Sequence, residues 1–402
     1  MAKAVLVVCD GLGDRPFAGG RTPLQASSKP NIDKLAASGI NGQMDVISPG
    51  IVPGSDTAHL ALLGYDPYQC YPGRGTFEAL GAEMDFREGD VAFRANFATV
   101  SEDGSIIDRR AGRIGSDSLA EALNVEIDGV EIRVKHTVDH RCAVVFRGEN
   151  LSHLVSDVDP HEEGMKPKKC RPLRNDESAV RTASIVNKFV ELSFKILDSH
   201  EENRERAERG IPKANILLLR GAGTYKSVEP FEQHFGFRAC FIAGASLYKG
   251  VAKFLGIQTI DVKGATGRAD TNLKNKAKAA VDALKKYDLV FIHVKATDNF
   301  GHDGDFHGKA SMIERIDSEL IPSLTETDAI ITITADHSTP VSIRRHSADP
   351  VPLLINGEGV RKDDVKAYDE ISVASGGLCR LRGLDLMPII SDLMGFYKMF
   401  GT

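Results

Sequence analysis

Short, unbroken runs of hydrophobic residues recur along this chain, each bounded by glycine, proline or charged residues. Runs of this kind are typical of strands that are buried on both faces of a parallel sheet. In the second half of the chain they alternate with segments of helical spacing, which predicts βα units joined by right-handed crossovers. The predicted strands lie within 4–11, 214–221, 237–244, 259–264, 288–298, 329–338 and 351–357, and the predicted helices within 29–39, 59–64, 177–200, 246–255, 272–286 and 310–324.

Residues 86–180 have a different pattern, with short, partly alternating segments separated by glycine and aspartate. Such alternation is typical of antiparallel strands with one solvated face. One helical piece is predicted near 116–124. We therefore predict a discontinuous α/β domain, formed by 1–85 and 181–402, with a mostly parallel sheet flanked by helices. A smaller, β-rich α+β domain is predicted as an insertion at 86–180.

Length and composition narrow the class of protein. The 402 residues suit two domains, and 50 basic against 56 acidic residues give a net charge of −6 without a basic block, which argues against a nucleic-acid surface. The six cysteines form no CxxC pair, as in a reduced cytosolic protein. No hydrophobic run approaches the ~18 residues of a membrane span. We expect a cytoplasmic protein that binds neither nucleic acid nor membrane, and the pattern leaves open whether it forms a homo-oligomer.

Aspartate and histidine residues follow the ends of several predicted strands, where ligands of open α/β sheets gather. Carboxylate and imidazole groups together are typical ligands of Zn²⁺, Mn²⁺ and related ions. Six such residues are too many for one tetrahedral site but suit two ions in one cleft, about 3.5–4 Å apart, which can clamp a phosphoryl group. The candidate ligands are Asp10, Asp298, His302, Asp336, His337 and His346.

A serine in the stretch VPGSDTAHLALLGYDP, at 52–67, has two interpretations. Ser55 precedes a short hydrophobic segment, as a helix N-cap does. Alternatively, its oxygen is a nucleophile that a metal holds as an alkoxide, at a helix N-terminus that favours anions. Of the other histidines, we expect His59 to pack or support the site, His293 to lie in the core, and His307 to contact substrate or solvent.

The motifs VVCDGLGD, PGSDTAHLALLGYDP, DNFGHDGD, TADHSTP and HSADPVPLLI resemble the metal-binding blocks of the alkaline phosphatase superfamily. The motifs DRRAGR, SDVDPH, LLLRGAG and GATGRADTNLK extend the resemblance to the archaeal type of 2,3-bisphosphoglycerate-independent phosphoglycerate mutase, over nearly the whole chain. The resemblance implies an alkaline-phosphatase-like fold and an isomerase of glycolysis and gluconeogenesis.

The resemblance also implies a mechanism that uses two divalent ions (Mn²⁺, Mg²⁺, Co²⁺ or Zn²⁺) and no 2,3-bisphosphoglycerate. The phosphate of 3-phosphoglycerate would pass to Ser55 and return to the 2-hydroxyl of the same glycerate. Asp298, His302 and His346 would hold one ion. Asp10, Asp336 and His337 would hold the other, together with the oxygen of Ser55.

The substrate carries a carboxylate and a phosphate, which guanidinium groups bind bidentately. Candidate binding residues are Arg109, Arg110, Arg113 and Arg220, with Lys295 beside the metal ligands, and Asp157, Asp159 and His161 for hydroxyl contacts or proton transfer. The arginines could equally be surface charges. Other functions also fit the motifs: a metal-dependent phosphomonoesterase or phosphodiesterase, a phosphopentomutase, or a binding protein without catalysis.

Overall fold

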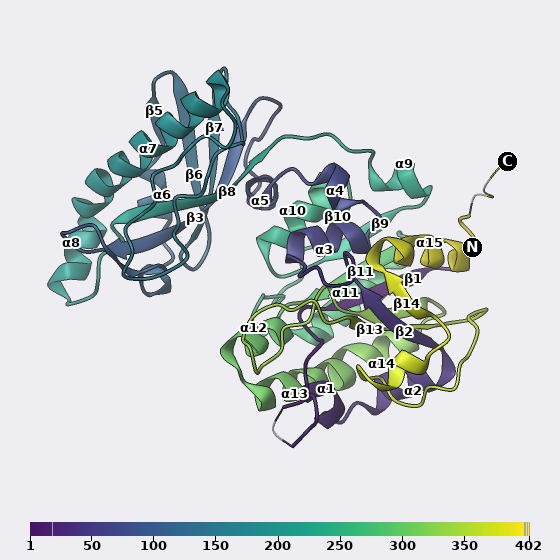
Figure 1. Cartoon of the computed structure of the whole chain (residues 1–402). Coiled ribbons are helices and arrows are strands. Elements are labelled where there is room, and N and C mark those ends of the chain that lie inside the picture. The colour runs from purple at the N-terminus through teal and green to yellow at the C-terminus, as the bar shows by residue number, and fades with distance from the viewer. Residues whose placement is uncertain (18, 398, 400, 402) are drawn as a thin grey trace. The chain divides into compact units, whose positions relative to one another are not determined.

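The computed structural model describes residues 1–402 apart from 18, 398, 400 and 402 (Figure 1). The chain forms two compact units, each with its own sheet. Unit 1 consists of residues 1–71 and 228–402, and unit 2 consists of residues 72–227. The sequence therefore indicated the correct kind of insertion, but the structure begins it earlier and ends it later than the expected 86–180.

Unit 1 is built on an eight-stranded sheet. The central strand β1 (Ala4–Cys9) pairs in parallel with β11 (Leu289–Val294) and with β12 (Ile330–Thr334). All six residues of β1 and of β11 are buried, as the hydrophobic runs predicted. Beyond β11 follow β9 (Ala239–Ile242) and β10 (Gln258–Thr259); beyond β12 follow β13 (Val351–Asn356), β2 (Ile40–Asp45) and β14 (Cys379–Arg382). Because only β13 runs antiparallel to its neighbours among these strands, the predicted mostly parallel sheet is confirmed.

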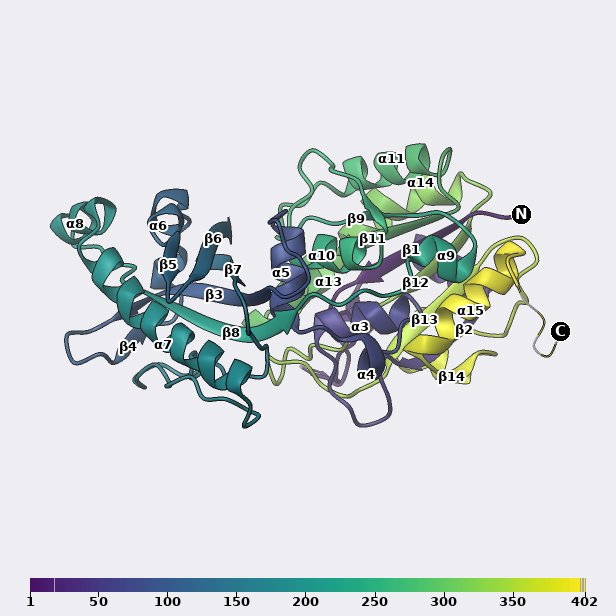
Figure 2. The same ribbon diagram turned by 90° about the horizontal axis from the view of Figure 1, so that it is seen from above.

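Helices cover both faces of this sheet (Figure 2). On one face, α3 (Ser55–Leu62) contacts both α10 (Ser246–Phe254) and α15 (Gly383–Met394). The other face carries α2 (Pro30–Ser38), α11 (Leu273–Ala283) and α13 (Phe306–Arg315), which continues through a π-helical turn, η2 (Ile316–Leu320), into α14 (Ile321–Thr325). The remaining helices of the unit are α1 (Pro23–Ala26), α4 (Pro67–Cys70), α9 (Phe231–Phe235), α12 (Ala296–Asp303) and η3 (Ser372–Ser375).

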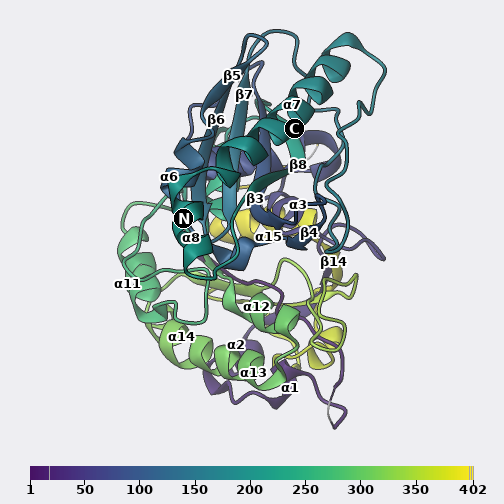
Figure 3. The ribbon, with the colours of Figure 1, turned by 90° about the vertical axis from the view of Figure 1, so that its left-hand side faces the viewer.

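Unit 2 is an antiparallel sheet, as its sequence pattern predicted (Figure 3). Its strands are β3 (Val91–Val100), β4 (Ile106–Asp108), β5 (Val125–Ile127), β6 (Val130–Val138), β7 (Arg141–Arg147) and β8 (Ile216–Thr224), in the order β4-β3-β7-β6-β5 with β8 also on β3. Shorter helical pieces are η1 (Ala111–Arg113), α6 (Asp117–Glu121) and α8 (Glu201–Glu208).

A long helix, α7 (Glu177–Asp198), forms the main core of unit 2 with the sheet. Asp176 caps it by accepting a hydrogen bond from the backbone N–H of Ala179, and hydrophobic residues at helical spacing form its buried face. The ring of Phe189 packs edge-on against Phe146 of β7, with centroids 5.7 Å apart. The helix is where the sequence predicted it, but it belongs to the inserted unit.

The boundaries were misplaced because β8 has the hydrophobic pattern of a parallel strand. It contacts both α7 and α5 (Arg74–Gly81), and its residues Ile216–Leu219 are all buried in the core that contains α7. Burial by two elements produces an unbroken hydrophobic run in an antiparallel strand as well. Pairing of β8 with β3, and packing of α5 on β3, extend the insertion in both directions along the chain.

No helix among the described residues has both the length and the hydrophobicity that a membrane span requires.

Candidate metal centre

Polar residues from four segments of unit 1 meet at one edge of its parallel sheet. Asp10 follows β1, Asp298 lies in α12 just after β11, and Asp336 and His337 follow β12. His346 precedes β13 instead of following it. Because β13 is antiparallel to β12, its beginning lies at the edge where the parallel strands end, which brings His346 to the same place.

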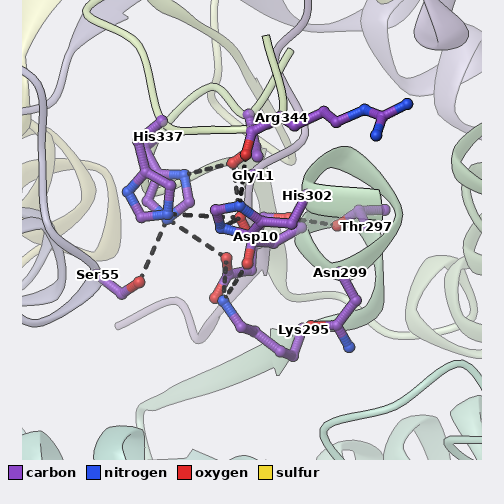
Figure 4. Close-up of polar contacts among 12 residues, drawn as sticks. Asp10, Gly11, Ser55, Lys295, Thr297, Asn299, His302, His337 and Arg344 are labelled. Carbon is purple, nitrogen blue, oxygen red and sulfur yellow. Dashed lines mark hydrogen bonds and ion pairs between the residues drawn. The ribbon is translucent and has the colours of Figure 1, made fainter. Parts of the chain in front are cut away.

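Among the described residues, two groups have ligand atoms within 4.8 Å of one another: Asp10, Asp336 and His337, and Asp298, His337 and His346. His337 belongs to both. Its Nε2 lies 3.4 Å from Oδ1 of Asp10 (Figure 4) and 3.3 Å from Oδ2 of Asp336. Its ring stacks on that of His346, with centroids 3.6 Å apart. Five of the six predicted ligands thus lie in two compact groups, either of which could hold a metal ion.

His302 lies beside these groups, next to both residues with which the resemblance grouped it. Its Nε2 is 3.4 Å from Oδ1 of Asp298, and its Nδ1 is 3.0 Å from the backbone oxygen of Arg344, whose side chain extends away from the centre (Figure 4). The His302 side chain is 43% exposed. Its ring centroid is 5.2 Å from that of His346, so the two expected neighbours, Asp298 and His346, both lie beside it, although the compact group of ligand atoms contains His337 and not His302.

Ser55 does not cap the helix that it begins. The N-cap of α3 is Gly54, and no side chain caps the helix by a hydrogen bond. The Ser55 side chain instead places its Oγ 3.3 Å from Nε2 of His337 (Figure 4). Of the two sequence interpretations, the structure excludes the N-cap and places the hydroxyl against the candidate metal ligands.

Asp10 is buried and surrounded by hydrogen-bond donors. Lys295 Nζ lies 3.0 Å from its Oδ1, His293 Nε2 lies 2.8 Å from its Oδ2, and the Tyr248 hydroxyl donates to the same Oδ2. Burial opposes ionisation, but Lys295, His293 and His337 together hold the pKa of Asp10 well below its usual range. Asp10 is therefore an anionic carboxylate with a fixed orientation.

Asp336 has one oxygen that nothing satisfies. Its Oδ1 accepts the backbone N–H of Gly11 at 3.1 Å, but its buried Oδ2 has no hydrogen-bond partner in the described part of the chain. Burial and the charge of Asp10 raise the pKa of Asp336 well above its usual range. A buried acceptor without a donor is unfavourable, and a bound cation would complete it.

Lys295 carries the positive charge closest to the centre. Its Nζ donates to Oδ1 of Asp10 at 3.0 Å and to Oδ2 of Asp298 at 2.6 Å. Burial alone would lower the pKa of Lys295, but the two carboxylates raise it well above its usual range. Burial likewise opposes ionisation of Asp298, and Lys295 nevertheless lowers the pKa of that carboxyl to about 2. The sequence had indicated Lys295 only as a possible substrate contact.

Several residues support the centre without being among the predicted ligands. Tyr248 comes from α10, and Thr339 donates to Oδ1 of Asp298 at 2.6 Å. His293 is a buried core residue, as expected, but it also bonds Asp10. His59 accordingly packs, with its ring centroid 4.8 Å from that of Tyr248, and its Nδ1 contacts the Ser55 carbonyl oxygen. Tyr248 and His293 adjoin the centre through the packing of distant elements, so local spacing carried no signal for their contacts with Asp10. Thr339 and His59, in contrast, lie within the quoted motifs, close in sequence to His337 and Ser55.

Most of the predicted substrate residues gather within unit 2. Arg109 donates to both carboxylate oxygens of Asp159, through Nε and Nη2, and its Nη2 lies 3.3 Å from Nδ1 of His161. Arg220 Nη1 lies 3.4 Å from the same imidazole nitrogen, and Oδ1 of Asp157 accepts the N–H of Gly221, next to Arg220. A cavity of about 780 Å³ is lined by residues that include Asp157, Asp159 and His161. Arg110 and Arg113 are exposed.

Comparison with known proteins decides the family. A family model described as 2,3-bisphosphoglycerate-independent phosphoglycerate mutase matches residues 36–203. A protein of that name from Archaeoglobus fulgidus is 52% identical, over 99% of both chains. The chain belongs to this family. A second member, from Methanosphaera stadtmanae, is 49% identical over the full length of both chains. The chain is therefore an enzyme of the isomerase class, and the sequence resemblance is confirmed.

Solved structures agree with this membership. A cofactor-independent phosphoglycerate mutase from Thermoplasma acidophilum is 40% identical, with a TM-score of 0.71 over 98% of this chain and 100% of that one. A protein from Pyrococcus horikoshii is 39% identical, with a TM-score of 0.87 over 100% of this chain and 99% of that one. The expected combination of a mostly parallel α/β domain and an inserted β-rich domain is confirmed.

Proposed function

We propose that this enzyme interconverts 3-phosphoglycerate and 2-phosphoglycerate, without 2,3-bisphosphoglycerate, and that Ser55 carries the phosphate between the two positions. The observation that supports this most directly is the 3.3 Å separation between Ser55 Oγ and Nε2 of His337. His337 is the one residue common to both candidate metal groups. In a mutase family, a serine oxygen in this position is the best candidate for a nucleophile.

Two divalent metal ions are part of the proposal. Asp10, Asp336 and His337 would hold one, and Asp298 and His346, with His302 or His337, would hold the other. Mixed carboxylate and imidazole donors suit Mn²⁺, Co²⁺ and Zn²⁺, and Mg²⁺ accepts the carboxylates. The unsatisfied Oδ2 of Asp336 fits this assignment. When bound, such ions lower the pKa of a nearby hydroxyl and neutralise phosphate charge.

The chemistry then requires two transfers through one serine. In the first, Ser55 Oγ loses its proton and bonds to phosphorus as the bond from phosphorus to O3 of the glycerate breaks, and O3 receives a proton. In the second, O2 of the glycerate loses its proton and bonds to the phosphorus as the bond to Ser55 Oγ breaks, and Oγ regains a proton. The phosphate returns to the glycerate that donated it and none is released. The glycerate must therefore stay bound, and water must be excluded, between the two transfers.

For glycerate binding we propose the cluster of unit 2 described above. Arg109 and Arg220 carry guanidinium groups suited to an oxyanion. Asp157 and His161 have side-chain atoms 3.5 Å apart at the edge of the same cluster and could carry a proton between O2 and O3. Lys295 would bind phosphate in unit 1. The exposed Arg110 and Arg113 remain candidates for the same role.

One assay tests the proposal. The enzyme receives 3-phosphoglycerate with Mn²⁺, Mg²⁺ or Co²⁺ in the absence of 2,3-bisphosphoglycerate, and both 2-phosphoglycerate and free phosphate are followed. We expect the isomer with little free phosphate. Release of phosphate without the isomer would identify a phosphatase instead. Isomerisation of ribose 1-phosphate, with no reaction of 3-phosphoglycerate, would identify a phosphopentomutase.

A further inference from the structure

One face of the unit 2 sheet buries an arginine on strand β3. Side chains alternate along this strand, and Phe93 and Phe97 point into the hydrophobic core that contains α7. Ala92 packs in a separate small cluster with Ala79 of α5, on the opposite face. Arg94 continues this second face and is only 6% exposed. Arginine is almost never buried so deeply unless it is paired.

Strand register places two more arginines on the same face. Arg94 lies directly opposite Arg220 of β8, and Asn96 lies directly opposite Arg141 of β7. Directly opposed residues share a face of the sheet, so the three guanidinium groups share one. Like charges in this arrangement destabilise a sheet. The three arginines therefore do not stabilise the fold through their contacts with one another.

The acidic partners do not balance these charges. Arg94 Nη1 lies 3.5 Å from Glu78, and Arg220 Nε lies 3.8 Å from Asp159, whose other contacts include Arg109. Over the described residues, Arg141 forms no salt bridge, and the Nε atoms of Arg94, Arg141 and Arg220 are buried without a hydrogen-bond partner. Three buried donors thus remain unsatisfied, at one place in the fold.

Two neighbouring polar atoms are also buried without a partner in the described chain, the Nδ1 of His140 and the acceptor Oδ1 of Asn96. His140 and Asn96 are 7% and 3% exposed. Burial and the surrounding arginines, Arg141 foremost, lower the pKa of His140 to about 3. Burial and neighbouring guanidinium groups also lower the pKa of Arg94 well below its usual range. A site with excess positive charge and unfilled donors is complementary to an oxyanion.

We propose that Arg94, Arg141 and Arg220 form an oxyanion-binding site within unit 2, which takes the carboxylate or the phosphate of a small phosphorylated acid. The identity of that acid as phosphoglycerate rests on the proposed function. Arg94 and Arg141 lie in none of the motifs that carry the family resemblance. They extend the site from Arg220 onto the neighbouring strands β3 and β7, on the same face of the sheet. The planar guanidinium groups can bind two oxygens of one such group in parallel, which an ammonium group cannot do.

The binding test uses the full chain after metal removal with a chelator, so that binding does not depend on the metal centre. Calorimetric titrations with 3-phosphoglycerate, glycerate and glycerol 3-phosphate are compared. We expect 3-phosphoglycerate to bind, and Arg94→Gln and Arg141→Gln each to weaken it about tenfold or more. Arg133→Gln is the matched control, because Arg133 is 60% exposed and paired with Glu131. If binding of glycerate is weakened by the arginine substitutions, the site takes the carboxylate. If binding of glycerol 3-phosphate is weakened instead, the site takes the phosphate.

A stability measurement separates binding from a structural role. Arg94→Gln removes a buried charge that faces Arg220, so the unliganded variant should unfold at the same temperature as the parent or higher. A structural arginine would give the opposite shift. Arg94→Lys should keep the charge but lose the bidentate contact, and so should bind more weakly than the parent.

Unchanged affinity in both glutamine variants, or no binding of any of the three ligands, would overturn the inference. An arginine-dependent site in a chain that does not isomerise 3-phosphoglycerate would overturn the proposed function alone. Isomerisation with an unchanged KM in Arg94→Gln would overturn only the oxyanion site.

Discussion

The hydroxyl oxygen of Ser55 lies 3.3 Å from Nε2 of His337, although the two residues are 282 positions apart in the sequence. Both are buried, and the contact joins the first turn of α3 to the loop after β12. The proposed transfers depend on this oxygen alone among the side chains of α3.

Replacing Ser55 by alanine should therefore abolish isomerisation, by at least about 10³-fold, because no other group in α3 would replace the nucleophile. Thermal unfolding should change little, since the hydroxyl does not cap the helix. Thr57→Ala is the control, because Thr57 is in the same turn and donates to the carbonyl of Gly54. Mass spectrometry of the acid-quenched enzyme should find a phosphorylated serine in the parent only. Isomerisation at the parental rate by Ser55→Ala would exclude the covalent route.

Metal removal should inactivate the enzyme reversibly. Treatment with a chelator is expected to stop isomerisation, and Mn²⁺, Mg²⁺ or Co²⁺ to restore it, because the carboxylates of Asp10, Asp298 and Asp336 then regain a counter-charge. Added ions should also raise the unfolding temperature, since they bind only the folded state. Full activity of metal-depleted enzyme would contradict the two-ion proposal.

Asp336→Asn should lose that metal-dependent rise in unfolding temperature. In the chelated protein the variant should unfold close to the parental temperature, since an amide resembles the uncharged carboxyl that burial favours. Asp282→Asn, at an exposed site paired with Lys285, serves as the control and should keep the metal response. An Asp336→Asn variant that responds to metal as the parent does would remove Asp336 from the ligand set.

Gly11 is expected to tolerate no side chain. Its φ of +65° is unfavourable for other residues, and an added Cβ would lie 2.9 Å from Cα of Asp298. Gly11→Ala should lower the free energy of unfolding through the unfavourable φ and, in addition, by about 1–3 kcal/mol through the steric overlap with Asp298. The variant should also be less active. Gly50→Ala is the matched control, because Gly50 has a φ of +80° and open space around it. Equal destabilisation in the two variants, measured by chemical denaturation, would exclude the close approach.

Glu370 should make the folded state less stable as the pH rises. Burial raises its pKa to about 7 from the ordinary 4.5, although it accepts hydrogen bonds from Thr22 Oγ1 and from the N–H of Asp14. The folded protein therefore binds the proton more tightly than the unfolded one, and stability is lost as the pH rises from about 4.5 through about 7.

Glu370→Gln should remove this loss, which amounts to at most about 3 kcal/mol between pH 5 and pH 8. The amide oxygen can accept only one of the two hydrogen bonds, from Thr22 or from Asp14, so the variant should lose some stability equally at both pH values while its fold is retained. Denaturation of parent and variant at both pH values measures the difference. Glu326→Gln, at an exposed glutamate, is the control. An identical pH dependence in parent and Glu370→Gln would show that the carboxyl ionises normally.

Much of the candidate centre could be predicted from the sequence because its residues follow strand ends. Asp10, Asp298 and Asp336 each come directly or shortly after a hydrophobic run, and parallel strands deliver such residues to one edge. The predicted ligands do lie together. The sequence could not show which ligands belong to which of the two candidate metal groups. The position of His337 between the groups depends on how β1 and β12 pair.

The supporting residues and the unit boundaries could not be predicted in the same way. Tyr248 reaches Asp10 because α10 follows β9 and packs near α3, a relationship between elements far apart along the chain. The run at 216–219 was interpreted as a parallel strand because hydrophobicity reports burial but not the direction of the neighbouring strand. The same uncertainty concealed Arg94, since alternation predicts a strand but not what covers its second face.

The sequence by itself indicated most of the buried strands, the longer helices such as α7 and α11, and the candidate metal donors that follow a strand, since these properties depend on neighbours within a few positions. It did not indicate β2, α5 or α15. Only the tertiary structure decided that His346 reaches the edge through an antiparallel strand, that Ser55 meets His337, and that three arginines share a face of unit 2. Such contacts depend on strand order and register, which are set by packing between distant segments, and local periodicity does not specify them.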